Sequence, residues 1–111
     1  MHTLEQLRSG ALEGITRLSL SCGLREFPPE IFTLAETLEI LDLSGNELTA
    51  LPDDLPRLHR LSIVFCSDNP FTELPAVLGR CPSLEMIGFK ANRIEHVPAE
   101  SLPPTLRWLV L

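Results

Sequence analysis

The sequence contains few basic residues and no tyrosine. Its 111 residues include nine Lys and Arg against 15 Asp and Glu, so the formal net charge is −6, and Lys90 is the only lysine. Proteins that bind nucleic acids or anionic membranes need a basic surface that neutralises phosphate groups. We therefore expect no nucleic acid and no membrane as a partner, and a protein partner is easier to accommodate.

Cysteine is scarce, and a long apolar run is missing. Cys22, Cys66 and Cys81 are an odd number, and no two of them form a C-x-x-C pair. No stretch approaches the ~18 consecutive apolar residues of a membrane span. The N-terminal residues also lack the basic segment and the apolar run of a signal peptide. Together these absences predict a reducing, cytoplasmic setting.

Motifs for catalysis, cofactor binding and metal binding are missing as well. The six glycines form neither a dinucleotide-binding pattern nor a P-loop. The three histidines are far apart in sequence, which does not fit the ligand spacing of a metal site. Ser67, Asp68 and Asn69 match a short motif of serine β-lactamases, but its S-x-x-K and K-T-G partners are absent. We expect no catalytic residues, no cofactor and no metal in these residues.

Leucine and proline, by contrast, are abundant, with 22 Leu and 10 Pro in the chain. A proline in a helix interior costs about 3 kcal/mol, so this composition argues against a simple helix bundle. Leucine, asparagine and proline also recur at a fixed interval of 23 residues. The recurring residues are Leu38, Leu61 and Leu84, Asn46, Asn69 and Asn92, and Pro52, Pro75 and Pro98. Three chemically different residue types with one period indicate an internal repeat.

The repeating unit follows the pattern L-x-x-L-x-L-x-x-N-x-L-x-x-L-P. Three successive copies begin LEILDLSGNELTALP, LSIVFCSDNPFTELP and LEMIGFKANRIEHVP. An earlier copy, from Ile15, is one residue short before Leu24 and one residue long before Leu38. We assign repeats to residues 15–37, 38–60, 61–83 and 84–105, with a partial repeat at 106–111.

Each repeat is predicted to contain one short strand and one tight turn. Leu41 and Leu43 alternate with Asp42, as in a strand with one buried face, and equivalent strands stack into a parallel sheet. The following asparagine can bond the backbone of the turn, so stacked copies form a ladder of satisfied amides. The predicted members of this structural ladder are Cys22, Asn46, Asn69 and Asn92. The short segment after each Leu-Pro step favours 3₁₀ or one to two α-helical turns.

The repeat pattern also assigns the cysteines. Cys66 takes the position of the inward Leu43, so we expect it to be buried. Cys22 takes the place of the first asparagine, where its thiol can bond the turn weakly. Cys81 is the candidate for an exposed thiol.

The two ends of the chain depart from the repeat. Residues 1–14 are predicted to form a capping helix, because Thr3 and Gln6 have the spacing of a capping box. At the other end, Leu106–Leu111 is an apolar strand with an unpaired edge, which would pair or aggregate unless it is covered. We expect either that the natural chain continues or that this edge is buried in an assembly.

The repeat pattern resembles the leucine-rich repeat family, in its intracellular 23-residue class, over about residues 15–111. The resemblance implies an α/β fold: a curved solenoid with a parallel sheet on its concave face and short helical or 3₁₀ turns on its convex face. The stretches SCGLREFPPEIF, FCSDNPFTELP, GFKANRI and LPPTLRWLVL most resemble the N-terminal repeats of bacterial leucine-rich-repeat-containing protein kinases. There the repeats precede a catalytic domain and are presumed to bind proteins. No Gly-rich loop, H-R-D or D-F-G motif occurs here, so no kinase residue carries over.

Residues on the concave face that the repeat does not fix are the candidates for binding. The predicted partner-binding residues are Ile40, Asp42, Ile63, Phe65, Met86, Lys90, Trp108 and Val110. Strand preference alone also favours apolar and aromatic residues here. A contiguous apolar stripe with a charged border nevertheless suits a protein partner better than a small ligand, which prefers a pocket.

The sequence therefore predicts a non-enzymatic protein-interaction module. We expect it to be the N-terminal part of a larger signalling protein such as a protein kinase. The alternative is a self-contained repeat protein that homodimerises through the Leu106–Leu111 edge.

Overall fold

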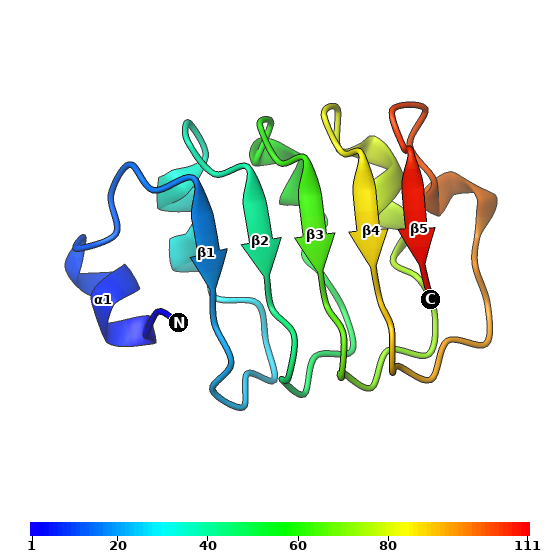
Figure 1. The fold of residues 1–111 in the computed structure, drawn as a ribbon, viewed down its shortest axis with the longest axis horizontal. Coiled ribbons are helices and arrows are strands. Elements are labelled where there is room, and N and C mark those ends of the chain that lie inside the picture. The colour runs from blue at the N-terminus through cyan, green and yellow to red at the C-terminus, as the bar shows by residue number, and fades with distance from the viewer.

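Five short parallel strands form a single sheet in the computed structural model, which describes all of residues 1–111. The strands are β1 (Arg17–Ser19), β2 (Ile40–Asp42), β3 (Ile63–Phe65), β4 (Met86–Gly88) and β5 (Trp108–Val110). They lie side by side in sequence order (Figure 1). The predicted repeat solenoid, with one strand per repeat, is therefore confirmed.

Equivalent residues of successive repeats face one another across the sheet. Ile40 of β2 is the register partner of Ile63 in β3, and Ile63 is the partner of Met86 in β4. The last pair joins Met86 to Trp108 of β5. Because the register follows the repeat, an outward residue of one strand always lies beside its equivalent in the next.

Short 3₁₀ helices bring the chain back from the end of one strand toward the start of the next. They are η1 (Pro29–Leu34), η2 (Leu55–Arg57), η3 (Ala76–Arg80) and η4 (Ala99–Ser101). Proline directly precedes three of them, at Pro28, Pro75 and Pro98, where its fixed φ suits a helix start. Figure 1 shows these helices behind the sheet, so they form the convex layer of the solenoid.

The hydrophobic core lies between the sheet and the 3₁₀ helices. The central inward positions of four strands are at most 1% exposed, and they are Leu18, Leu41, Val64 and Ile87. Further along the coil, the rings of Phe71 and Phe89 meet edge to face with their centroids 4.9 Å apart. Aromatic pairs in this geometry add about 0.5–1.5 kcal/mol beyond the burial of their surface.

The helix α1 (Leu4–Ser9) precedes the first repeat and is shorter than the predicted 1–14 segment. The predicted capping box is present, because the Thr3 hydroxyl accepts from the Gln6 N–H and the Gln6 side chain accepts from the Thr3 N–H. Gly10 ends the helix with a φ of 83°, a left-handed conformation that suits glycine. Leu7 and Leu12 are buried against the first repeat.

Candidate protein-binding surface

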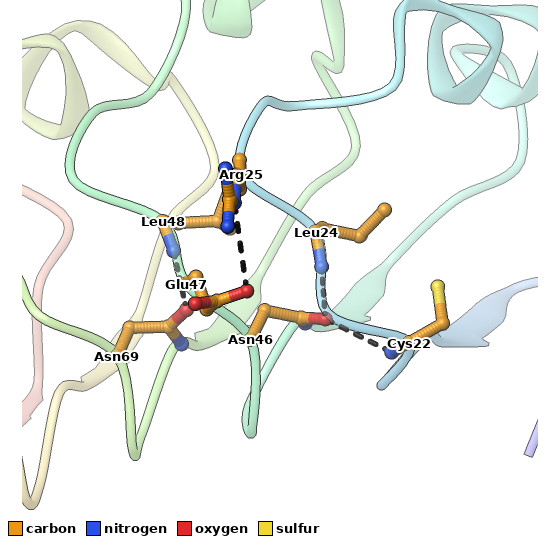
Figure 2. Close-up of polar contacts among 7 residues, drawn as sticks. All are labelled: Cys22, Leu24, Arg25, Asn46, Glu47, Leu48 and Asn69. Atoms are coloured by element: carbon orange, nitrogen blue, oxygen red, sulfur yellow. Dashed lines mark hydrogen bonds and ion pairs between the residues drawn. The ribbon is translucent and has the colours of Figure 1, made fainter.

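A buried asparagine amide closes the turn that follows the first strand. The Asn46 Oδ1 accepts hydrogen bonds from the backbone N–H groups of Cys22 (3.0 Å) and Leu24 (3.1 Å), as Figure 2 shows. Its Nδ2 donates to the carbonyls of Leu20 (2.9 Å) and Leu43 (2.8 Å). One side chain therefore satisfies backbone groups in two successive repeats.

The same arrangement recurs in the next two repeats. The Asn69 Oδ1 accepts from Leu48 N–H at 2.9 Å, and the Asn92 Oδ1 accepts from Phe71 N–H at 3.2 Å. The Asn69 Nδ2 donates back to the Leu43 carbonyl at 3.0 Å. Asn46 and Asn69 are buried, whereas Asn92 is half-buried. The three side chains form a ladder that holds the end of each strand in place.

The cysteines differ in part from their predicted roles. Cys22 takes part in the ladder only through its backbone N–H, and Figure 2 shows its sulfur turned away from the Asn46 amide. Its exposed thiol makes no hydrogen bond, which corrects the expectation that the thiol bonds the turn. Cys81 is buried rather than exposed, because it follows η3 into the core, and burial raises the pKa of its thiol to about 11. Cys66 is fully buried, as its inward position predicts.

A second ladder, which the sequence analysis missed, runs along the residue just before each repeat. A Thr or Ser hydroxyl there donates to a backbone carbonyl that lies 21 to 24 residues earlier in the chain. The pairs are Thr37 with Ile15 (2.8 Å), Ser83 with His59 (2.9 Å) and Thr105 with Leu84 (2.6 Å). Arg60 takes the equivalent position in the remaining repeat. A Thr or Ser at three of these four equivalent positions was the signal in the sequence.

The concave face is the sheet surface that points away from the core. It brings together seven of the eight residues predicted for partner binding, because they occupy the outward positions of paired strands. The half-buried members are Ile40, Asp42, Ile63, Phe65 and Met86, and the exposed members are Trp108 and Val110.

Lys90, the eighth predicted residue, lies outside the sheet in the turn after β4. Its carbonyl accepts from the Asp68 N–H at 3.0 Å and from the Asn92 Nδ2 at 3.3 Å. Its side chain is exposed and forms no ion pair. The structure therefore places Lys90 at the border of the concave face.

The ring of Phe65 occupies space that a side chain at Gly88 would fill. A Cβ atom on Gly88 would lie 2.8 Å from Phe65 Cδ1 and 3.2 Å from Cε1. Glycine inside a strand often marks a close approach of another group, and here that group is an aromatic ring of the neighbouring strand. A side chain at Gly88 would therefore have to displace the Phe65 ring.

Charged side chains border the concave face. Glu85 and Arg107 form an exposed ion pair at 3.7 Å, and the Arg107 guanidinium lies 5.4 Å from the centre of the Trp108 ring. Asp42, in contrast, has no cationic partner in the structure. The face thus combines an apolar centre with one unpaired carboxylate.

The titratable side chains do not gather into a metal site. No three His, Cys, Asp or Glu residues are grouped as metal ligands. His59 and His96 instead contact acidic residues of the preceding repeat, Glu36 at 3.3 Å and Glu73 at 3.8 Å. None of the helices has the length and apolar character needed to cross a membrane.

The stacked parallel strands, the buried leucines and the asparagine ladder together define a leucine-rich-repeat solenoid. A family model described as Leucine Rich Repeat matches residues 37–58. The chain therefore contains leucine-rich repeats and folds as a leucine-rich-repeat solenoid.

Comparison with individual proteins gives the same class. The chain is 33% identical over 89 residues to PH domain leucine-rich repeat-containing protein phosphatase 1 of Homo sapiens. The aligned segment covers 79% of this chain and 5% of that protein. It is 36% identical over 81 residues to leucine-rich repeat serine/threonine-protein kinase 1 of Mus musculus, covering 72% of this chain and 4% of that protein. A solved leucine-rich-repeat protein of Leptospira interrogans matches with a TM-score of 0.72 and 26% identity, covering 92% of this chain and 28% of that one. The chain thus spans about a twentieth of the length of the phosphatase and the kinase.

Proposed function

We propose that this chain is a protein-interaction module that binds a partner through its concave face. The observation that carries the proposal is the in-register apolar row on the outward side of β2 to β5. Protein interfaces are enriched in aromatic residues and methionine, and Phe65, Met86 and Trp108 provide both. Contiguous apolar surface of this kind is uncommon on a protein that has no partner.

Strand preference is a weaker explanation of the same residues. Isoleucine favours strands for reasons unrelated to binding, so Ile40 and Ile63 are accounted for either way. Methionine has no such preference. Met86 on β4 therefore supports binding over strand preference.

Substitution of two central residues tests the proposal. Phe65→Asp combined with Met86→Asp should abolish capture of a cellular protein by the immobilised chain, because two carboxylates would be desolvated against the partner. Circular dichroism should not change, since both side chains lie outside the core. The matched control, Ala50→Asp with Thr72→Asp, adds the same charge at exposed positions away from the strands and should leave capture intact. Undiminished capture by the first variant would sink the concave-face proposal.

We further propose that the module works within a larger signalling protein. Two relatives that support this are a phosphatase and a kinase, in which the matching repeats are a small part of the chain. Within this proposal, the larger protein is a bacterial protein kinase, and it lies in the cytoplasm. The three free thiols support a reducing compartment. Reading the gene beyond the codon for Leu111 tests the kinase context, and fractionation of tagged protein tests the location.

Self-association through β5 is the second candidate function. The outer edge of this strand pairs with no other strand, and Trp108, Leu109 and Val110 are exposed. An apolar strand edge is a template for pairing with another chain. Light scattering should then report a dimer that Leu109→Lys converts to a monomer, and a monomeric unaltered chain would exclude this candidate.

A further inference from the structure

We propose that Asp42 and Phe65 form a subsite for a cationic side chain of the partner, with arginine as the best fit. The proposal rests on the concave-face function and names the chemistry that the face selects. Asp42 of β2 and Phe65 of β3 are direct register partners, so their side chains rise from neighbouring strands on the same face. Neighbouring strands lie ~4.8 Å apart, so one planar cation can touch both groups.

The Asp42 carboxylate has an oxygen free for a partner. Oδ1 accepts from the Ser44 N–H at 3.0 Å, which fixes the orientation of the carboxylate, and Oδ2 accepts no hydrogen bond within the chain. The negative charge of Asp42 also affects a neighbouring titratable group, the thiol of Cys66. Burial, and to a smaller extent the negative charge of Asp42, raises the pKa of the Cys66 thiol. A half-buried carboxylate without a cation gains more from pairing than a fully solvated one.

The Phe65 ring leans away from this carboxylate. The ring occupies the space above Gly88 on β4, which is the strand on the opposite side of β3 from Asp42. A cation can therefore approach Asp42 and still contact the ring. We regard Gly88 as a positioning residue, because a side chain there would push the ring out of this place.

The molecule already contains one complete site of this kind on another surface. The guanidinium carbon of Arg57 lies 4.5 Å from the centre of the Phe32 ring, and Arg57 Nη1 lies 3.3 Å from Asp54 Oδ2. A guanidinium is planar, so it can stack on an aromatic ring and bond a carboxylate at once. The concave face provides the ring and the carboxylate, and the partner would supply the cation.

The cations of this chain that border the face do not fill the subsite. Arg17 on β1 and Lys90 after β4 are exposed, and neither forms an ion pair or a cation–π contact in the structure. With Asp42 unpaired, the charge complementarity of the face therefore calls for a cation from outside.

A random peptide library displayed on phage and selected against the whole chain tests the proposal. The enriched peptides should carry an arginine next to apolar residues. A synthetic peptide of the enriched sequence should lose about tenfold in affinity for Asp42→Asn, as expected for removal of a partly desolvated charge contact. Replacing its arginine with glutamine should cause a similar loss, and the two changes together should cost no more than either one, since they remove the same interaction.

Two further substitutions, tested singly and together, connect the subsite to its surroundings. Phe65→Leu and Gly88→Ala should each weaken the peptide severalfold, because the first removes the ring and the second displaces it. Gly88→Ala should have no additional effect in the Phe65→Leu background if it acts through the ring. The control Asp54→Asn changes an aspartate whose cation is already in place, so peptide affinity should not change.

The outcomes separate the subsite from the broader function. Absence of enriched peptides with a cation, or unchanged affinity in Asp42→Asn, would overturn the subsite. If the double variant Phe65→Asp and Met86→Asp still abolished peptide binding in that case, the concave-face function would stand without the subsite. If neither this double variant nor Asp42→Asn affected binding, both proposals would fail.

Discussion

Asn69 satisfies the backbone of two repeats through a single buried amide. Its Oδ1 accepts from Leu48 N–H at 2.9 Å, and its Nδ2 donates to the carbonyls of Leu43 at 3.0 Å and Cys66 at 3.1 Å. The residue is 5% exposed, so water cannot replace these bonds when the side chain is removed. Unpaired buried polar groups cost more than the bonds themselves contribute to net stability.

Asn69→Ala should therefore lower the free energy of unfolding by about 1–3 kcal/mol. Asn92→Ala provides the comparison and should cost less, since Asn92 is half-buried and water can reach its partners. Urea denaturation of the two variants measures both losses. An unchanged midpoint for Asn69→Ala would contradict the role of the ladder in stability.

Individual residues were predictable from the sequence to the extent that the repeat fixes their position. The burial of Cys66 followed directly from its place in the strand. The burial of Cys81 did not, because it depends on how η3 packs, and the pattern is loosest in that segment. The lean of Phe65 over Gly88 depends on a neighbour 23 residues away and needs the register to be known.

At the scale of elements, the hydroxyl ladder connects the segments that lead into the strands, and it is interrupted once. Thr37 and Thr105 are each the last residue of a repeat, and they donate to the carbonyl of the first residue of the same repeat, at 2.8 Å and 2.6 Å. Arg60 stands at the equivalent position before Leu61 and has no such hydrogen bond. By repeat equivalence, a hydroxyl at this position would reach the carbonyl of Leu38.

Arg60→Thr should complete this ladder and raise the free energy of unfolding by about 0.5–1 kcal/mol, the net contribution of one hydrogen bond. Arg60→Val is the matched control, because valine has nearly the shape of threonine without the hydroxyl. Thermal or urea denaturation measures the difference between the two variants. Equal stability of Thr and Val at this position would show that the hydroxyl contributes nothing.

The strands were more predictable than the helix that precedes them. Each strand is fixed by inward residues such as Leu41 and Leu43, whose alternation admits only one orientation. The start of α1 was equally clear from Thr3 and Gln6. Its end was not, because the chain after Gly10 continues as turns while Leu12 still packs into the core.

At the scale of the whole molecule, one ion pair joins the N-terminal helix to the convex layer. Arg8 of α1 contacts Glu30 of η1 with its Nε 2.9 Å from the carboxylate oxygen Oε2. A hydrogen bond from its own backbone N–H, and then the bond from Arg8, hold the pKa of Glu30 below its ordinary value. A carboxylate with a lowered pKa in the folded state stabilises that state at neutral pH and loses this effect in acid.

Docking of α1 should therefore weaken as the pH falls below the ordinary glutamate pKa of 4.5 and through the lower pKa of Glu30. The methyl NMR chemical shifts of Leu7 and Leu12 should move toward the values of the unfolded chain over that pH range. Glu30→Gln should remove this pH dependence, and Glu13→Gln, at an exposed site without an ion pair, should not. Identical pH profiles for the unaltered chain and Glu30→Gln would contradict the assignment.

The asparagine ladder also gives the coil a direction. Asn46 and Asn69 each reach back to close the turn of the repeat before their own. Removing a repeat from the C-terminal side therefore removes the asparagine side chain that closes the turn of the preceding repeat. Removing a repeat from the N-terminal side leaves the remaining turns closed. Shortening the coil from its two ends is thus not equivalent: one cut exposes an unfinished turn, and the other exposes a finished one.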